Sequence, residues 1–322
     1  MITIQDIFKA KKRISPYIIE TPLEYSKPLS DEIGTDIFLK LENLQVSGSF
    51  KPRGGLNKIL KIRETNPNAE FVAPTAGGHG VGLSYSAKVL NAKVHILMPE
   101  NADSDRLNDI RNNGASIQIF KSVPEATAEA KKLEKEKGYI FVSAYNDTEM
   151  IEGGGTIGIE LLSQIPDIDC IVCGVGGGGY LAGIGIVLKA INPEIKMYGV
   201  QQENSPFLAD WFKTKKYPTN FKLKPSIAEG IGAEVEEDTI TWNYINKFVQ
   251  DFIVVSEDEI KETLKWTTEN HKHYVEPSGI VGLAGIRKNA DIFKKYKKIV
   301  TVISGRNMAY DKFLKILNEN RS

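Results

Sequence analysis

The sequence predicts an α/β protein with two domains, each built on a mostly parallel sheet flanked by helices. Short apolar runs of strand length alternate with longer helical segments along the 322 residues, and this alternation is typical of parallel sheets covered by helices on both faces. Glycine-rich segments also follow directly after apolar runs, where α/β sheets bind ligands. The expected strands contain Ile37–Leu39, Phe71–Ala73, Val94–Leu97, Tyr139–Val142, Cys170–Val175, Met197–Val200, Phe252–Val255 and Ile299–Ile303.

One expected helix is defined by both its composition and its end. The stretch from Glu125 to Lys137 consists mainly of strong helix formers, and Gly138 follows it as a residue type that often ends helices. No repeat, low-complexity tract or flexible linker interrupts the sequence. Domain boundaries are therefore not visible in the composition.

The charge balance points away from polymeric anions. Lys and Arg together number 41, as do Asp and Glu, so the formal net charge is zero. A neutral surface offers no extended positive field to a phosphate backbone or an anionic bilayer. The most apolar stretch, residues 168–191, contains Asp169, Lys189 and many glycines, which is unsuited to a membrane span. We expect small-molecule chemistry, with neither nucleic acid nor membrane as a partner.

The two cysteines, Cys170 and Cys173, form a Cys-x-x-Cys pattern. Their surroundings resemble a buried strand, on which residues three apart point to opposite faces. We therefore predict two core residues rather than a shared metal or a redox pair. So few cysteines fit a reducing compartment, and we expect a cytoplasmic protein.

The first loop that could take part in chemistry is Ser47–Gly55, which follows an apolar run at residues 38–41. Pro52 suits the first turn of a helix, and Ser49 is a plausible N-cap. Lys51 would then lie at the positive end of a helix, which favours the neutral amine needed for attack on an aldehyde. The alternative is an ordinary solvated lysine, and these physical arguments alone favour it.

A second loop, residues 74–82, reads Pro-Thr-Ala-Gly-Gly-His-Gly-Val-Gly. Consecutive glycines at a helix N-terminus let backbone N–H groups approach an anion, such as a substrate carboxylate. We interpret His79 as a packing or capping residue rather than a catalytic one.

The third loop, residues 174–180, reads Gly-Val-Gly-Gly-Gly-Gly-Tyr and is suited to binding a phosphate without side-chain charge. It also satisfies the dinucleotide pattern G-x-G-x-x-G, with Glu203 as a candidate ribose-binding acid. The loop alone does not separate these two interpretations. A fourth stretch at residues 302–308 contains Ser304, which can hydrogen-bond a heterocycle nitrogen or cap a helix.

In this order, the four loops resemble those of the pyridoxal-phosphate enzymes of the tryptophan-synthase-β fold (fold type II), specifically the threonine/serine dehydratase and serine racemase branch. The resemblance covers nearly the whole chain and is most specific from Leu39 to Lys51. Similar motifs occur at residues 151–156, 228–231 and 275–279.

The resemblance implies that pyridoxal 5'-phosphate is bound as a Schiff base on Lys51, which then acts as general base. Ser304 would face the pyridine nitrogen and, as a neutral group, make the ring a moderate electron sink suited to β-elimination. The implied cofactor-binding residues are Phe50, Lys51, Gly78, Gly176, Gly177, Gly178, Gly179 and Ser304, and the implied substrate-binding residues are Ser49, Thr75, Ala76, Gly77, His79 and Arg306.

The implied activity is that of an ammonia-lyase, or dehydratase, acting on a small hydroxy-amino acid such as serine or threonine. In the racemases of this family a serine stands at the position of Ala76, and two acidic ligands of a divalent cation stand at the positions of Gln201 and Phe207. These differences favour the lyase, and no metal site is expected. An amino-acid racemase, a β-replacing enzyme and a catalytically silent cofactor-binding protein are the alternatives.

Two residues depart from the family pattern. Most relatives have an asparagine at Gly78, which bonds the cofactor's ring oxygen, and a glycine at Arg306. Near the ring nitrogen, the charge of Arg306 would oppose protonation of the ring. Alternatively, its guanidinium would bind a second substrate carboxylate, as in a hydroxyaspartate lyase, or the side chain would point into solvent.

The family also suggests how the chain is divided. By analogy, residues 1–69 and 149–322 form a large cofactor-binding domain, and residues 70–148 form a small inserted domain that closes over the substrate. A homodimer is the expected assembly, since dimers are common in the family.

Overall fold

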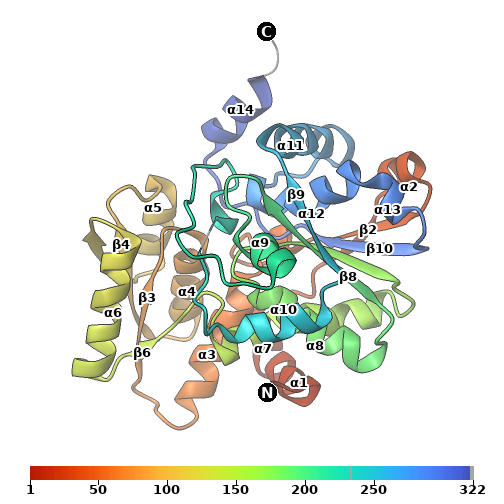
Figure 1. The fold of residues 1–322 in the computed structure, drawn as a ribbon. Helices are drawn as coiled ribbons and strands as arrows, with labels where there is room; N and C mark the ends of the chain where they lie inside the picture. Colours follow the sequence, from red (N-terminus) through yellow and green to blue (C-terminus); the bar gives the residue numbers. More distant parts are fainter. Residues whose placement is uncertain (233, 320–322) are drawn as a thin grey trace.

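The computed structural model describes residues 1–232 and 234–319. Within these residues the strands form two separate sheets, one of six strands and one of four. Figure 1 shows the four-stranded sheet and its helices as one side of the molecule, with the larger sheet on the other. The predicted α/β class, with two mostly parallel sheets flanked by helices, is confirmed.

The larger sheet is parallel except at one edge. The strand β1 pairs antiparallel with β2, whereas the other neighbouring strands are parallel. Ile299 lies between Ile37 and Cys170 on the adjacent strands. In spatial order the strands are β1 (Leu23–Tyr25), β2 (Asp36–Lys40), β10 (Lys298–Val302), β7 (Cys170–Gly174), β8 (Lys196–Gln202) and β9 (Asp251–Val255).

The smaller sheet is parallel throughout. Its strands all come from one continuous stretch of sequence, whereas those of the larger sheet come from before and after it. This arrangement accommodates the small domain expected at residues 70–148, whose boundaries and closing motion stay predictions. In spatial order the strands are β5 (Ser116–Phe120), β4 (Lys93–Pro99), β3 (Glu70–Pro74) and β6 (Ile140–Phe141).

Helices cover both faces of the larger sheet (Figure 1). One face packs on α2 (Lys27–Ile33), α11 (Glu257–His271), α12 (Pro277–Lys288), α13 (Ala290–Phe293) and α14 (Tyr310–Asn318). The other packs on α7 (Thr148–Gln164), α8 (Gly179–Ile191), α9 (Phe207–Thr214) and α10 (Ile240–Phe248), with α1 (Ile4–Ile14) outside α7 and α8. Short 3₁₀ turns are present at Ser15–Tyr17, Glu42–Leu44 and Glu229–Ile231.

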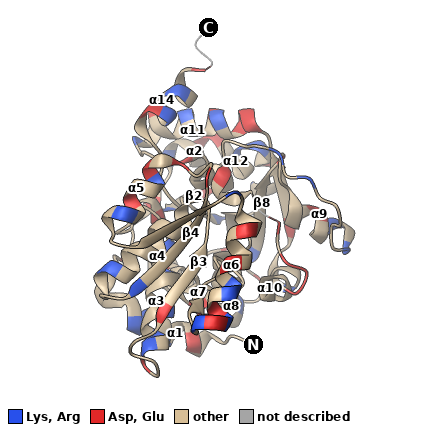
Figure 2. Cartoon of the chain, turned by 90° about the vertical axis from the view of Figure 1, so that its left-hand side faces the viewer, with Lys and Arg blue, Asp and Glu red and all other residues tan. Residues whose placement is uncertain are grey.

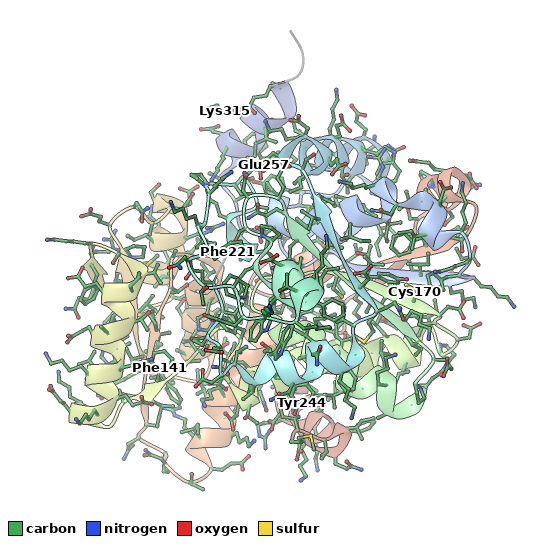
Figure 3. The ribbon with its side chains drawn as sticks, viewed as in Figure 1. Phe141, Cys170, Phe221, Tyr244, Glu257 and Lys315 are labelled. Carbon is green, nitrogen blue, oxygen red and sulfur yellow. The ribbon has the colours of Figure 1, made fainter. Side chains whose placement is uncertain are left out.

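The smaller sheet has its own two helical layers. Apolar side chains of α3 (Lys51–Arg63), α4 (Gly78–Val89) and α5 (Ser104–Asn112) share a core with one face, and α6 (Val123–Lys137) covers the other. In Figure 3, Phe141 lies in this smaller part of the molecule and Cys170 in the larger one. The helix α3 therefore contacts the smaller core, although it precedes that sheet in the sequence.

Three helices meet through glycines rather than through side chains. A Cβ atom on Gly153 of α7 would lie 2.3 Å from the carbonyl oxygen of Arg53 in α3. A Cβ atom on Gly183 of α8 would lie 2.3 Å from the carbonyl oxygen of Ile151 in α7. Because both distances are far below van der Waals contact, the backbones of α3, α7 and α8 touch directly.

The two cysteines are core residues, as predicted. Cys170 and Cys173 are both buried, and they belong to the cores on opposite faces of the larger sheet. Burial raises the pKa of the Cys173 thiol to about 12. The surface carries Lys and Arg interspersed with Asp and Glu (Figure 2). In the described part of the chain, no helix has the length and apolar character required to cross a membrane.

Three local features differ from the sequence-based expectation. The strands β1 and β5 were not predicted, because β1 has only three residues and β5 is a half-exposed edge strand. The helix α6 begins at Val123 rather than Glu125, since Ser122 accepts a hydrogen bond from the backbone N–H of Glu125 as its N-cap. It ends at Gly138, in a left-handed conformation, as expected.

A cluster of four charges is buried beneath the start of α3. The side chains of Lys40, Glu42, Arg53 and Glu160 have 0% exposure. The guanidinium of Arg53 donates to Glu42 at 2.7 and 2.8 Å and to Glu160 at 2.7 and 2.9 Å. Lys40 donates to Glu160 at 2.7 Å. Burial would raise the pKa of Glu160, but Arg53 and Lys40 lower it to about 2, so the pairs stay ionised.

Replacing Arg53 with methionine is expected to lower the free energy of unfolding by about 3–5 kcal/mol, because Glu42 loses its positive partner and Glu160 loses one of its positive partners. Urea-induced unfolding monitored by circular dichroism measures the change. Lys27→Met is the matched control, since it removes an exposed pair with Asp31 and should leave the transition nearly unchanged. Coinciding transitions for Arg53→Met and the unmodified protein would contradict the interpretation.

Candidate active site

Lys51 is the first residue of α3, and Pro52 occupies the first turn as predicted. The predicted N-cap is wrong: Phe50 holds that position, and no side chain caps the helix. Ser49 is buried, and its hydroxyl has no hydrogen-bond partner among the described residues. The serine is therefore available to a ligand rather than consumed by the helix.

The amine of Lys51 is not an ordinary solvated group. Burial lowers its pKa to about 8, although Glu276 acts in the opposite direction. Within the described residues, no hydrogen bond or ion pair engages the amine, which lies 4.7 Å from the centre of the Phe50 ring. Gly82 of α4 faces the lysine so closely that a Cβ atom there would lie 2.4 Å from the lysine Cβ. The site thus leaves the amine unpaired and makes its neutral form far more accessible than that of an ordinary lysine.

The segment with Ser304 lies directly beside the lysine loop. Ser49 and Gly305 form an isolated bridge, and the N–H of Phe50 donates to the carbonyl of Ser304 at 3.2 Å. The N–H of Ser304 donates to Gly279 at the start of α12. The fold therefore brings together two loops that are about 250 residues apart in the sequence, as the resemblance implied.

The glycine-rich loop connects β7 to the N-terminus of α8. Gly178 adopts φ of +85°, and a Cβ atom on Gly177 would lie 2.1 Å from the Tyr145 ring, so neither position tolerates a side chain well. Tyr180, which follows the loop, has its ring 4.7 Å from that of Phe50. The loop is thereby placed next to the lysine, with N–H groups at a helix N-terminus to hold a phosphate.

The alternative interpretation as a dinucleotide site required Glu203 as the acid that binds the ribose. The carboxylate of Glu203 accepts a hydrogen bond from the N–H of Glu257 at 3.1 Å, at the start of α11. It therefore acts on a helix terminus and is not free to bind a ribose.

The loop from Thr75 to His79 leads into α4. Thr75 accepts a hydrogen bond from the N–H of Gly77, and Ala76 is exposed. His79 is buried, with Nε2 3.3 Å from the carbonyl oxygen of Val142, which supports its interpretation as a packing residue. Burial and the nearby Lys51 lower the pKa of His79 to about 3, so its ring is neutral.

Sequence reasoning missed two charged groups near the lysine. Glu276 immediately precedes α12, and its carboxylate lies beside Gly305. Burial raises the pKa of this carboxyl group. Arg106 of α5 lies 3.5 Å from Glu276 and 3.2 Å from Glu229, so it joins the smaller part of the molecule to the larger one. Glu276 lies within the family-like motif at residues 275–279, so the sequence could have indicated it as a site residue. Nothing in its surroundings distinguishes Arg106 from the other basic residues.

Arg306 lies outside this inner region. Its side chain is exposed and lines an open hollow of about 520 Å³ that Arg106 also borders. Asp103, Asp105 and Asp109 belong to the same wall. Contact between Arg306 and a substrate carboxylate stays a prediction.

The residues present fit a cofactor that is both an aldehyde and a phosphate ester. Lys51 supplies an unpaired amine, residues 176–179 supply a cradle without side chains, and Ser49 supplies an unpaired buried hydroxyl. Lys51 would hold the aldehyde carbon and the cradle the phosphate. The fold and site therefore define an α/β enzyme built to bind such a cofactor through a lysine.

Comparison with known proteins agrees. Residues 14–305 match the family described as pyridoxal-phosphate dependent enzyme, and the chain belongs to this family, which binds pyridoxal 5'-phosphate. It is 35% identical to an L-threonine ammonia-lyase of Thermotoga maritima over 99% of this chain and 79% of the relative. It is 34% identical to a serine racemase of Dictyostelium discoideum over 98% of both chains. The solved structure of maize serine racemase superposes with a TM-score of 0.91 at 29% identity, covering 99% of this chain and 98% of that one.

The lowered pKa of Lys51 predicts how fast the cofactor-free protein takes up pyridoxal phosphate. At pH 7 about a tenth of the amine is neutral if its pKa is 8, against less than about one part in a thousand at its ordinary value. Below pH 8 the rate should rise about tenfold per pH unit, and above about pH 8 it should level off. Stopped-flow absorbance measures it, with free Nα-acetyl-lysine as the reference for the cofactor's own titration. A protein rate that rises in parallel with this reference up to pH 10 would rule out the lowered pKa.

Gly78 has room for the asparagine amide that the family pattern leads us to expect at this position. It is the first residue of α4, and a Cβ atom there would meet nothing within 4 Å. Gly78→Asn is expected to tighten cofactor binding about 10- to 100-fold, the effect of one hydrogen bond to a charged group. Equilibrium dialysis measures the affinity, and Gly78→Ala is the control because it adds the Cβ without the amide. An equal gain in both variants would show that helix propensity, rather than a cofactor contact, is responsible.

Proposed function

We propose that the protein is an ammonia-lyase that removes the β-hydroxyl of a small hydroxy-amino acid of the serine or threonine type, releasing a 2-oxo acid and ammonia. Among its relatives are an L-threonine ammonia-lyase and a serine racemase at nearly equal identity. Identity therefore does not separate the two reactions. The composition of the Thr75–His79 loop is the observation that supports the lyase.

Racemisation requires proton carriers on both faces of the substrate's α-carbon. In this loop Ala76 has no proton to transfer, and His79 is neutral and buried, with its Nε2 at the carbonyl oxygen of Val142. Lys51 is then the proton carrier of the proposed reaction, and its Nζ accepts the α-proton in the neutral form. One basic group on one face suits elimination better than inversion.

The other residues have binding roles in this proposal. Bound pyridoxal phosphate supplies the electron sink that stabilises charge at the α-carbon. Ser304 donates to or accepts from the ring nitrogen, and Phe50 packs beside the lysine. The N–H groups of Gly78 and His79, at the N-terminus of α4, hold the substrate carboxylate, with Ser49, Thr75 and Gly77 beside them.

The position corresponding to a racemase metal ligand has another use here. The side-chain amide of Gln201 donates to the carbonyl of Val175 at 3.1 Å and accepts from the N–H of Ala209 at 2.8 Å. Phe207 packs among aromatic rings. Both residues therefore contribute to the fold rather than to a cation site, which supports the lyase over a metal-dependent racemase.

A hydroxyaspartate-type lyase is the second candidate. Arg106 and Arg306 border the same hollow, so two guanidinium groups are available to a second substrate carboxylate. The three aspartates on that wall partly offset this attraction. Arg106 would also have to exchange its pairs with Glu229 and Glu276 for the substrate. We therefore place it behind the serine or threonine lyase. The expected homodimer belongs to the same proposal.

A panel of L-serine, L-threonine and threo-3-hydroxyaspartate tests the proposal and ranks the candidates. We expect 2-oxo acid and ammonia in equal amounts from serine or threonine, little D-serine, and no turnover by Lys51→Ala. Ala76→Ser is expected to raise racemisation relative to elimination, because it adds a proton carrier to the loop. Chiral chromatography and a coupled 2-oxo acid assay measure both products.

The other outcomes of the panel are equally informative. Serine racemisation as fast as elimination in the unmodified protein would reject the lyase in favour of the racemase. Preferential turnover of hydroxyaspartate would favour the second candidate. A cofactor spectrum that no substrate perturbs would favour a β-replacing enzyme or a silent cofactor-binding protein.

A further inference from the structure

Two of the four histidines in the sequence share one carboxylate, in a part of the fold that the proposed reaction does not use. Glu24 of β1 has one carboxylate oxygen 2.5 Å from Nδ1 of His271 and the other 2.7 Å from Nε2 of His273. One potential ligand atom from each of the three side chains lies within 4.8 Å of the others. We propose that Glu24, His271 and His273 form a binding site for a divalent transition-metal ion, with Zn²⁺ as the best-suited ion.

The backbone places both imidazoles on the same side. His271 is the last residue of α11, and Lys272 follows in a left-handed conformation with φ of 60°. The turn at Lys272 reverses the chain, so the rings of His271 and His273 are nearly parallel, 3° apart in plane and 6.1 Å between centres. The amine of Lys272 bonds the carbonyl of Glu269, which keeps its charge out of the cluster.

A buried hydroxyl selects which nitrogen of His271 faces the carboxylate. Nε2 of His271 lies 2.8 Å from the hydroxyl of Ser26, a residue with 0% exposure. Histidines that bind metals commonly have their second ring nitrogen engaged in this way, which fixes the ring orientation. If Nε2 donates to Ser26, Nδ1 is left as the lone-pair nitrogen that a metal requires.

Exposure decides between a metal site and a catalytic triad. Ser26, His271 and Glu24 are connected like a serine nucleophile, its base and its acid, but the serine is fully buried and no substrate can reach it. The metal-ligating side is open instead, with side-chain exposures of 33% for Glu24 and 18% for His273. An ion can therefore enter from solvent, and water can complete its coordination.

The donor set determines the kind of ion. Two imidazoles and one carboxylate suit Zn²⁺ and neighbouring transition metals, whereas Mg²⁺ and Ca²⁺ prefer oxygen ligands. Tetrahedral Zn²⁺ with bonds of about 2.0–2.1 Å needs neighbouring ligand atoms about 3.3 Å apart. The present nitrogen–oxygen contacts must open by about 0.6–0.8 Å to reach that separation. The partly exposed Glu24 carboxylate can make this adjustment.

The location indicates a structural role. The site connects the edge strand β1 to the segment that leads from α11 to Glu276, three residues beyond His273. This segment and β1 are about 250 residues apart in the sequence, and a bound ion would link them. It would do so without contacting the cofactor region. The inference therefore does not rest on the proposed lyase activity.

Isothermal titration of the cofactor-loaded protein with Zn²⁺ tests the site. We expect one ion per chain with a dissociation constant in the micromolar range or tighter, and no competition from millimolar Mg²⁺. Saturation should raise the unfolding temperature by at least about 3 °C. Titration with Co²⁺ alone should produce visible d–d bands of a tetrahedral ion, at longer wavelength than the cofactor absorbs.

Variants separate this site from adventitious binding. Glu24→Gln, His271→Gln and His273→Gln should each weaken binding by more than about 100-fold, and Ser26→Ala by about 10- to 100-fold. The matched control is His95→Gln, because His95 also contacts a glutamate and a serine, Glu70 through Nε2 and Ser116 through Nδ1, but has no second histidine beside it. Cofactor absorbance and circular dichroism of each variant establish that it is folded before titration.

Several results would overturn the proposal. Absence of binding in the unmodified protein would leave only a carboxylate shared by two histidines. Binding that survives in His273→Gln and Glu24→Gln, or that is lost in His95→Gln, would place the ion elsewhere. Binding that depends on Lys51 but not on His273 would assign it to the cofactor region.

Discussion

Arg53 lies between the carboxylates of Glu42 and Glu160, and this contact joins two neighbouring segments to a third that lies 107 residues further along the chain. Glu42 comes from the turn after β2, Arg53 from the first turn of α3 and Glu160 from α7. Lys40 completes the cluster, so two positive and two negative charges are enclosed together. Removing water from such charges is costly, and the cost is offset only when each group has its partners in place. The network therefore specifies where α3 begins, and with it the position of Lys51.

The contacts around the lysine differ in kind on its two sides. Below it, α3 packs on α7, and α7 on α8, through backbone contacts that leave no space for adjustment. Above it, α5 reaches the larger part of the molecule through Arg106, which pairs with Glu229 and Glu276. An ion pair at a partly open surface is easily exchanged for water. The structure thus combines close backbone packing below the lysine with contacts between charged side chains above it.

The sequence predicted most of the fold because buried parallel strands have a strong signal. Each of the eight expected strands is present, since apolar runs such as those at β7 and β8 are enclosed by helices on both faces. The strand β1 has too few residues to show a pattern, and β5 has polar residues because one face meets solvent.

For the site, the glycine loops and Lys51 were visible through spacing. The N-cap was predicted at Ser49, but α3 begins at Lys51, so Phe50 holds the cap position. Arg106 was not visible, since its role depends on how α5 is placed against α12.

The glycines between α3, α7 and α8 have a consequence for how this protein can evolve. At Gly153 and Gly183 even a methyl group would collide with the backbone of a neighbouring helix, so nearly every substitution there displaces the base of the site. Gly78, by contrast, faces open space, and Ala76 is exposed, so both can change without disturbing the packing. Around the lysine, substitutions are thereby accommodated more easily at these two positions, which are proposed to contact the cofactor or substrate. The same framework can acquire a new reaction while the lysine stays where it is.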